Sequence, residues 1–73
     1  MRMALDEILK NIRKELNLTQ EQLSRDLNVS FSTLNRWENS RTIPSRLARM
    51  RLLDYCIKNG VSAEIVSELE RAK

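Results

Sequence analysis

The stretch LNLTQEQLSRDLNVSFSTLNRWENSRT, residues 16–42, decides the fold of this chain of 73 residues. The Thr19 hydroxyl can accept from the amide three residues on, and the Gln22 side chain can reach back, so a capping box opens a helix here. The helix is expected to end near Leu27, because Asn28 suits a left-handed turn position. The first part of the stretch therefore predicts a short helix followed by a tight turn.

A second helix is expected over residues 31–39, opened by Ser30 as its N-cap. Leu34 and Trp37 lie three positions apart in it, which places both on one side. The predicted inner face of the helix pair consists of Leu23, Leu27, Val29, Leu34 and Trp37. Trp37 is therefore expected to pack in the core rather than to stack on a base.

The other side of helix 31–39 has short, polar or planar side chains. These are Phe31, Ser32, Thr33, Asn35 and Arg36. Asparagine and arginine can each make two hydrogen bonds to one base edge, and serine or threonine can bond to bases or phosphates. Base reading by Ser32, Thr33, Asn35 and Arg36 is the functional hypothesis. The alternative is that Asn35 and Arg36 are ordinary solvated residues of an exposed helix face.

Three further helices are expected around this pair, which makes the fold class all-α. The first, over 4–16, has Leu5, Ile8, Leu9, Ile12 and Leu16 at helical spacing. The fourth, over 44–58, begins with Pro44 in its first turn and ends at Gly60. Its predicted inner face is Leu47, Met50, Leu53, Cys56 and Ile57. The last, over 63–72, follows Ser62 and has Ile65, Val66 and Leu69 on one side.

The composition of the chain argues against several classes of function. The chain has one cysteine and no histidine, so we expect no intramolecular disulfide, no metal site and no cofactor. Residues 41–58 have five basic side chains against one acidic, whereas residues 1–40 have six of each. No apolar run approaches the ~20 residues of a membrane span. We therefore expect a single cytoplasmic domain over residues 1–73 that is not an enzyme.

Three segments of the stretch resemble the phage repressor and Cro-like helix-turn-helix proteins, the Xre family. They are Thr19-Gln20-Glu21-Gln22-Leu23, Asn28-Val29-Ser30 and Thr33-Leu34-Asn35-Arg36-Trp37-Glu38-Asn39. The resemblance extends more loosely over residues 5–57. It implies a compact five-helix domain that places helix 31–39 in the major groove of double-stranded DNA.

The resemblance also implies roles for single residues. Ser32, Thr33, Asn35 and Arg36 match positions that face the bases, and Gln20, Ser30, Arg41 and Arg46 are the expected contacts to the DNA backbone. It further implies that Arg13 pairs with Glu38 and so fixes the reading helix. The chain departs from the family where Asn28 and Ser40 replace the usual glycines. It also departs at Phe31, which is a candidate contact to a thymine methyl group or else a packing residue.

The sequence thus predicts a transcription regulator that binds double-stranded DNA. The alternative is a helical interaction module, or an antitoxin-like adaptor, whose main partner is another protein. With three aromatic residues, the chain is poorly equipped to stack single-stranded RNA. One reading helix contacts few base pairs, so we expect a homodimer joined through residues 61–72, with Val66 and Leu69 at the interface. The alternative for these two side chains is that they only close the core.

Overall fold

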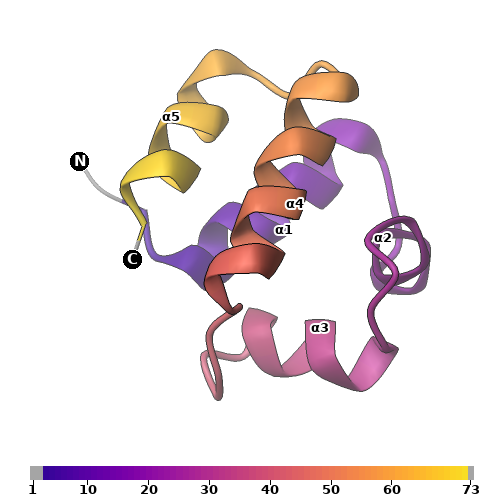
Figure 1. Cartoon of the computed structure of the whole chain (residues 1–73). Coiled ribbons are helices and arrows are strands. Elements are labelled where there is room, and N and C mark those ends of the chain that lie inside the picture. Colours follow the sequence, from indigo (N-terminus) through magenta and orange to yellow (C-terminus); the bar gives the residue numbers. More distant parts are fainter. Residues whose placement is uncertain (1–2, 73) are drawn as a thin grey trace.

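A computed structural model describes residues 3–72, which form five α-helices and no β-strand in that range. The helices are α1 (Leu5–Leu16), α2 (Gln20–Asp26), α3 (Phe31–Glu38), α4 (Arg46–Lys58) and α5 (Ala63–Arg71). In Figure 1, α3 lies across the lower end of the molecule and α4 rises from beside it, with α5 next to α4. The all-α class expected from the sequence is confirmed. Within the described part of the chain, no helix has the length and apolar composition needed to cross a bilayer.

Hydroxyl side chains cap four of the five helices at their N-termini. The capping box of α2 is present: the Thr19 Oγ1 accepts from the Gln22 amide at 3.1 Å, and the Gln22 Oε1 accepts from the Thr19 amide at 2.8 Å. The other caps are Ser30, Ser45 and Ser62. Such a cap typically stabilises a helix by about 1 kcal/mol, so these residues help to fix where the four helices begin.

The beginning of α4 differs from the prediction. Pro44 was expected in the first helical turn, but α4 begins at Arg46 after Ser45 as its N-cap. The Ser45 Oγ accepts from the Ala48 amide at 3.2 Å. Pro44 is buried just before the cap. The reason is that serine is a far better N-cap than the residues before it, so the helix starts after Ser45.

The core lies around α1, whose Ile8, Leu9 and Ile12 side chains are fully buried. Helix α1 packs against α3 and α5, α2 packs against α3, and α4 packs against α5. The other buried apolar residues are Leu23, Leu27, Leu34, Trp37, Leu52, Cys56, Val61, Ile65 and Leu69. Trp37 is 7% exposed, which confirms that it packs in the core.

The predicted inner side of α4 is only partly correct: Cys56 is buried and Leu53 is partly buried, as expected, but the other three residues are not. Leu52 and Cys56 are fully buried, whereas Leu47, Met50 and Ile57 are 66%, 59% and 62% exposed. Both sets recur at helical spacing, so the apolar pattern alone does not choose between them. Burial, with the charge of Glu15, raises the pKa of the Cys56 thiol to about 11.

Helix α5 belongs to the core of the single chain. Leu69 is 3% exposed, so the prediction that it lies at a dimer interface is wrong. Val66 is only partly buried, and its proposed interface role stays a prediction. Glu15 of α1 holds the start of α5, because its carboxylate accepts from the Ser62 amide at 2.9 Å and from the Ser62 hydroxyl at 2.8 Å. The C-terminal stripe therefore closes the monomer.

Candidate nucleic-acid interface

The turn between α2 and α3 is tight because Asn28 adopts a left-handed backbone conformation, with φ at +57°. The Val29 amide then donates to the Ser24 carbonyl at 2.9 Å. Ser24 is buried, and its small side chain lets the two helices approach each other. Ser40, in the loop after α3, also has a positive φ, at +58°. These are the two positions where the sequence has Asn and Ser in place of the family's glycines.

The inner side of α3 is fixed to the core by three residues. Leu34 is fully buried, Trp37 is 7% exposed and Glu38 is 2% exposed. The first two supply apolar packing, while Glu38 places a carboxylate at the end of the helix. A buried carboxylate requires compensation by a charge or by hydrogen bonds.

Arg13 of α1 compensates Glu38 through two parallel hydrogen bonds. The Arg13 Nε donates to the Glu38 Oε2 at 2.8 Å, and the Nη2 donates to the Oε1 at 2.7 Å. This hydrogen bonding raises the pKa of the Arg13 guanidinium. The ion pair implied by the family resemblance is confirmed, and it holds the C-terminal end of α3 on α1.

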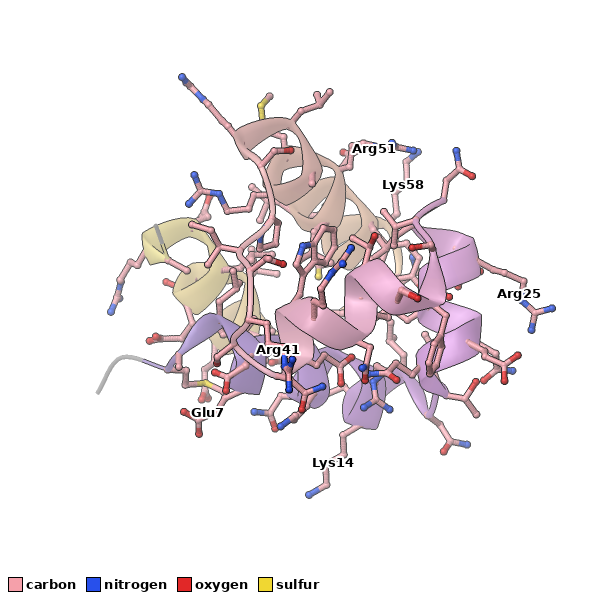
Figure 2. All side chains as sticks on the ribbon, turned by 90° about the horizontal axis from the view of Figure 1, so that it is seen from below. Glu7, Lys14, Arg25, Arg41, Arg51 and Lys58 are labelled. Carbon is pink, nitrogen blue, oxygen red and sulfur yellow. The ribbon has the colours of Figure 1, made fainter. Side chains whose placement is uncertain are left out.

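The outward side of α3 contains the predicted base-reading residues. Ser32, Asn35 and Arg36 are exposed, and Thr33 is partly buried. Phe31, at the beginning of the helix, is 48% exposed. Figure 2 views the molecule from below, with α3 lying across the front. The structure therefore brings these side chains to one accessible side of a firmly anchored helix.

Hydrogen bonds within the chain orient two of these side chains. The Ser30 hydroxyl donates to the Thr33 Oγ1 at 2.8 Å, so the Thr33 hydroxyl proton remains free. The Asn39 Nδ2 donates to the Asn35 Oδ1 at 3.1 Å and to the Asn35 carbonyl at 2.7 Å, which leaves the Asn35 Nδ2 free to donate. Arg36 has donors only. The accessible side of α3 therefore presents hydrogen-bond donors outward.

The predicted backbone-contacting residues lie on α2, on α4 and in the segments that flank α3. Gln20 is the first residue of α2, Arg46 is the first residue of α4, and Arg41 lies in the loop between α3 and α4. Both arginines are exposed, and Figure 2 shows Arg41 beside α3. Ser30 is the N-cap of α3. Its hydroxyl donates to the Thr33 Oγ1 and accepts from the Thr33 amide. The Ser30 hydroxyl therefore has no proton left to donate to a phosphate.

Three further residues of this region were not predicted from the sequence. Asn39 orients Asn35, and the only signal for it was the spacing of four positions between the two asparagines. Lys14 and Arg25 are exposed and point outward at the edges of the same view. Lys14 is near the end of α1, and Arg25 is near the end of α2. They add positive charge at the rim of the surface around α3.

The model of a helix-turn-helix family matches residues 9–48, which is more than half of the chain. The match runs from α1 through the first residues of α4 and includes all of α2 and α3. The chain therefore belongs to the helix-turn-helix family of the phage repressor and Cro-like, or Xre, type, whose members bind DNA. Searches among curated proteins and among solved structures find no significant match.

Proposed function

We propose that the protein is a sequence-specific regulator of transcription that places α3 in the major groove of double-stranded DNA. The observation that carries this proposal is the division of α3 into two sides. One side is locked to the core by Leu34, Trp37 and the Arg13–Glu38 pair, and the other presents exposed polar side chains. A rigid support of this kind keeps reading residues in the geometry that base recognition requires.

The free donors on α3 favour base edges that present acceptors. In the major groove these are the O6 and N7 of guanine, the N7 of adenine and the O4 of thymine. Arg36 suits a bidentate contact to guanine, while Asn35 and Thr33 each offer a single oriented donor. Phe31 is exposed enough to contact a thymine methyl group. A half-site with at least one guanine opposite Arg36 is the expected target.

The residues around α3 supply the sequence-independent part of the affinity. Gln20, Arg41 and Arg46 are the proposed side-chain contacts to the sugar–phosphate backbone, whereas the Ser30 hydroxyl already donates its proton to Thr33. Cationic contacts release counterions from DNA, so binding is expected to weaken steeply as salt increases. The regulatory role also implies the location of the protein: we expect it in the cytoplasm, with the DNA that it binds.

Two copies are expected to bind one operator. A single α3 reads only a few base pairs, and two-fold pairing places two reading helices about 34–36 Å apart on one side of the duplex. The site would then be a near-palindrome with half-sites about 10 base pairs apart. Whether the protein activates or represses transcription depends on where that site lies relative to a promoter.

The proposal is tested by selecting bound duplexes from a random pool and titrating the selected and random duplexes at several salt concentrations. We expect selected sites to bind at least about 10³-fold more tightly than random DNA. Replacing the guanine opposite Arg36 by 7-deazaguanine, which lacks the N7 acceptor, should remove part of that preference. Failure to bind any duplex at low salt would overturn the proposal in favour of the adaptor alternative.

A further inference from the structure

Phe31 is an exposed apolar side chain among the polar residues on the outward side of α3. It is the first residue of the helix, and it is 48% exposed. It belongs neither to the buried core nor to the partly buried apolar residues that pack against the core. The other residues of that side are Ser32, Thr33, Asn35 and Arg36, all of which are polar. Core packing therefore does not account for a phenyl ring at this position.

Hydrogen bonds hold the first turn of α3 in a fixed conformation. The Ser30 hydroxyl accepts from the Thr33 amide at 3.1 Å and donates to the Thr33 Oγ1 at 2.8 Å, and the Ser30 carbonyl accepts from the Leu34 amide at 3.1 Å. In helix-turn-helix proteins, the N-terminal residues of the reading helix contact base edges. With α3 in the major groove, a placement that rests on the proposed function, the Phe31 ring therefore lies at the edge of a base pair.

A phenyl ring distinguishes base pairs through one chemical group. The major-groove edges of guanine, adenine and cytosine present hydrogen-bond donors and acceptors, whereas thymine also presents the methyl group on C5. A ring that covers polar edge groups removes them from water without offering a hydrogen bond, which is unfavourable. A ring that covers the methyl group buries apolar surface on both partners. The edge that Phe31 favours is therefore a pyrimidine with a methyl group on C5.

Two DNA bases have this methyl group, thymine and 5-methylcytosine. We propose that Phe31 makes α3 a reader of the C5 methyl group, so that methylation of a cytosine at this position strengthens operator binding. Thymine and 5-methylcytosine differ at C4, where thymine has an oxygen and 5-methylcytosine an amino group, but an apolar ring on the methyl group contacts both bases alike. Occupancy of the operator then depends on methyl transfer to C5 of a cytosine in the site, as well as on base sequence.

The free donors of α3 set the order among four pyrimidines at this position. The Thr33 hydroxyl proton and the Asn35 Nδ2 are free to donate. The O4 of thymine and of uracil accepts a hydrogen bond, whereas the N4 amino group of cytosine is itself a donor. Thymine should therefore bind best and unmethylated cytosine worst. Uracil, which has the oxygen without the methyl group, and 5-methylcytosine, which has the methyl group without the oxygen, should lie between them.

Single-base replacement in the selected duplex tests the proposal. Each thymine is replaced in turn by deoxyuridine, which lacks only the methyl group, and the duplexes are titrated with the whole chain. One thymine in each half-site should lose affinity about fourfold, which corresponds to the burial of one methyl group. A C·G pair at the same position should gain about fourfold when C5 of the cytosine is methylated. N4-methylcytosine is the matched control, because its methyl group is on the amino nitrogen, and it should gain nothing.

Two variants of the chain assign the effect to one side chain. Phe31→Ala should bind thymine and uracil equally at that position, and cytosine and 5-methylcytosine equally, with unchanged helical circular dichroism. Ile43→Ala is the control, since Ile43 is 66% exposed in the loop between α3 and α4, and it should keep both fourfold differences. Methyl differences that persist in Phe31→Ala overturn the proposal, as does a selected site without a methyl-dependent thymine. Failure to bind any duplex would instead refute the proposed function, and the methyl-reading role with it.

Discussion

Helices α3 and α4 both lie on the core, but their outward sides are opposite in character. The outward side of α3 is polar, with Asn35 and Arg36 exposed, whereas that of α4 is apolar, with Leu47 and Ile57 exposed. The core requires only one apolar side from each helix. The polar outward side of α3 supports the proposal that this helix binds DNA.

The two helices also differ in how they are held. An ion pair with two hydrogen bonds fixes the end of α3 to α1. Helix α4 is tied at its sides: the Tyr55 hydroxyl donates to the Asp26 carboxylate at 2.7 Å, and the Arg49 Nη1 donates to the Ala72 carbonyl at 2.9 Å. A reading helix gains specificity from a precisely fixed backbone.

The largest expected effect is a difference in unfolding free energy between substitutions on the two sides of α4. Leu52→Ala should lower the free energy of unfolding by about 2–5 kcal/mol, because it leaves a cavity in the core. Leu47→Ala removes the same atoms from an exposed position, and should change the free energy of unfolding by less than about 0.5 kcal/mol. Urea unfolding measures both, at a protein concentration low enough to keep the chain monomeric. Equal losses would contradict the burial pattern of α4.

The second-largest expected effect tests the Arg13–Glu38 ion pair, which holds the end of α3 on α1. Arg13→Ala leaves Glu38 as an uncompensated buried carboxylate, and should lower the free energy of unfolding by about 3 kcal/mol. Glu38→Ala should cost less, because the Arg13 side chain is 25% exposed and can reach water. The Arg71–Glu68 pair is the control: Arg71 is 56% exposed and lies 3.6 Å from Glu68, so Arg71→Ala should cost under about 1 kcal/mol. A double-mutant cycle without coupling between Arg13 and Glu38 would contradict the role of the pair.

Alkaline pH probes the buried side of α4 through Cys56. Burial raises the pKa of this thiol from 9.0 to about 11, so folding favours the neutral form. Its contribution is fully present below pH 9 and is lost as the pH rises through 11, up to about 3 kcal/mol. The difference in unfolding free energy between wild type and Cys56→Ala should therefore change over that range. A difference that stays constant from pH 8 to about 11 would show that the thiol is not buried.

The smallest effect concerns the orientation of Asn35. Asn39→Ala removes the donor that occupies the Asn35 Oδ1, and should weaken specific binding by about 0.5–1.5 kcal/mol. The side chain is then free to turn, so the preference at one base pair should broaden. Repeating the site selection with this variant gives the measurement. Asn59→Ala is a control on α4, where a similar amide bonds only to the Tyr55 carbonyl. An unchanged base preference in Asn39→Ala would remove Asn39 from the recognition mechanism.

The same contrast explains what the sequence could predict. Helix α3 has one apolar side and a strong N-cap, so its limits, its buried Trp37 and its outward residues were predictable. Helix α4 has two apolar sides at helical spacing, and only packing decides which of them is buried. The same limit explains the wrong prediction for Leu69, because an apolar stripe near the end of a chain is compatible both with core packing and with a dimer interface. The orientation of Asn35 by Asn39 depends on side-chain geometry that no pattern specifies.

The central claim is that α3 reads base sequence while its surroundings hold the backbone, and Arg36 tests this most directly. The measurement is the affinity of wild type, Arg36→Ala and Arg41→Ala for the selected site and for random duplex, each over a range of salt. Arg36→Ala should lose about 1–3 kcal/mol on the selected site and little on random DNA. Arg41→Ala should lose equally on both and reduce the log–log salt slope by about one unit. Equal losses of Arg36→Ala on both duplexes would contradict base reading by α3.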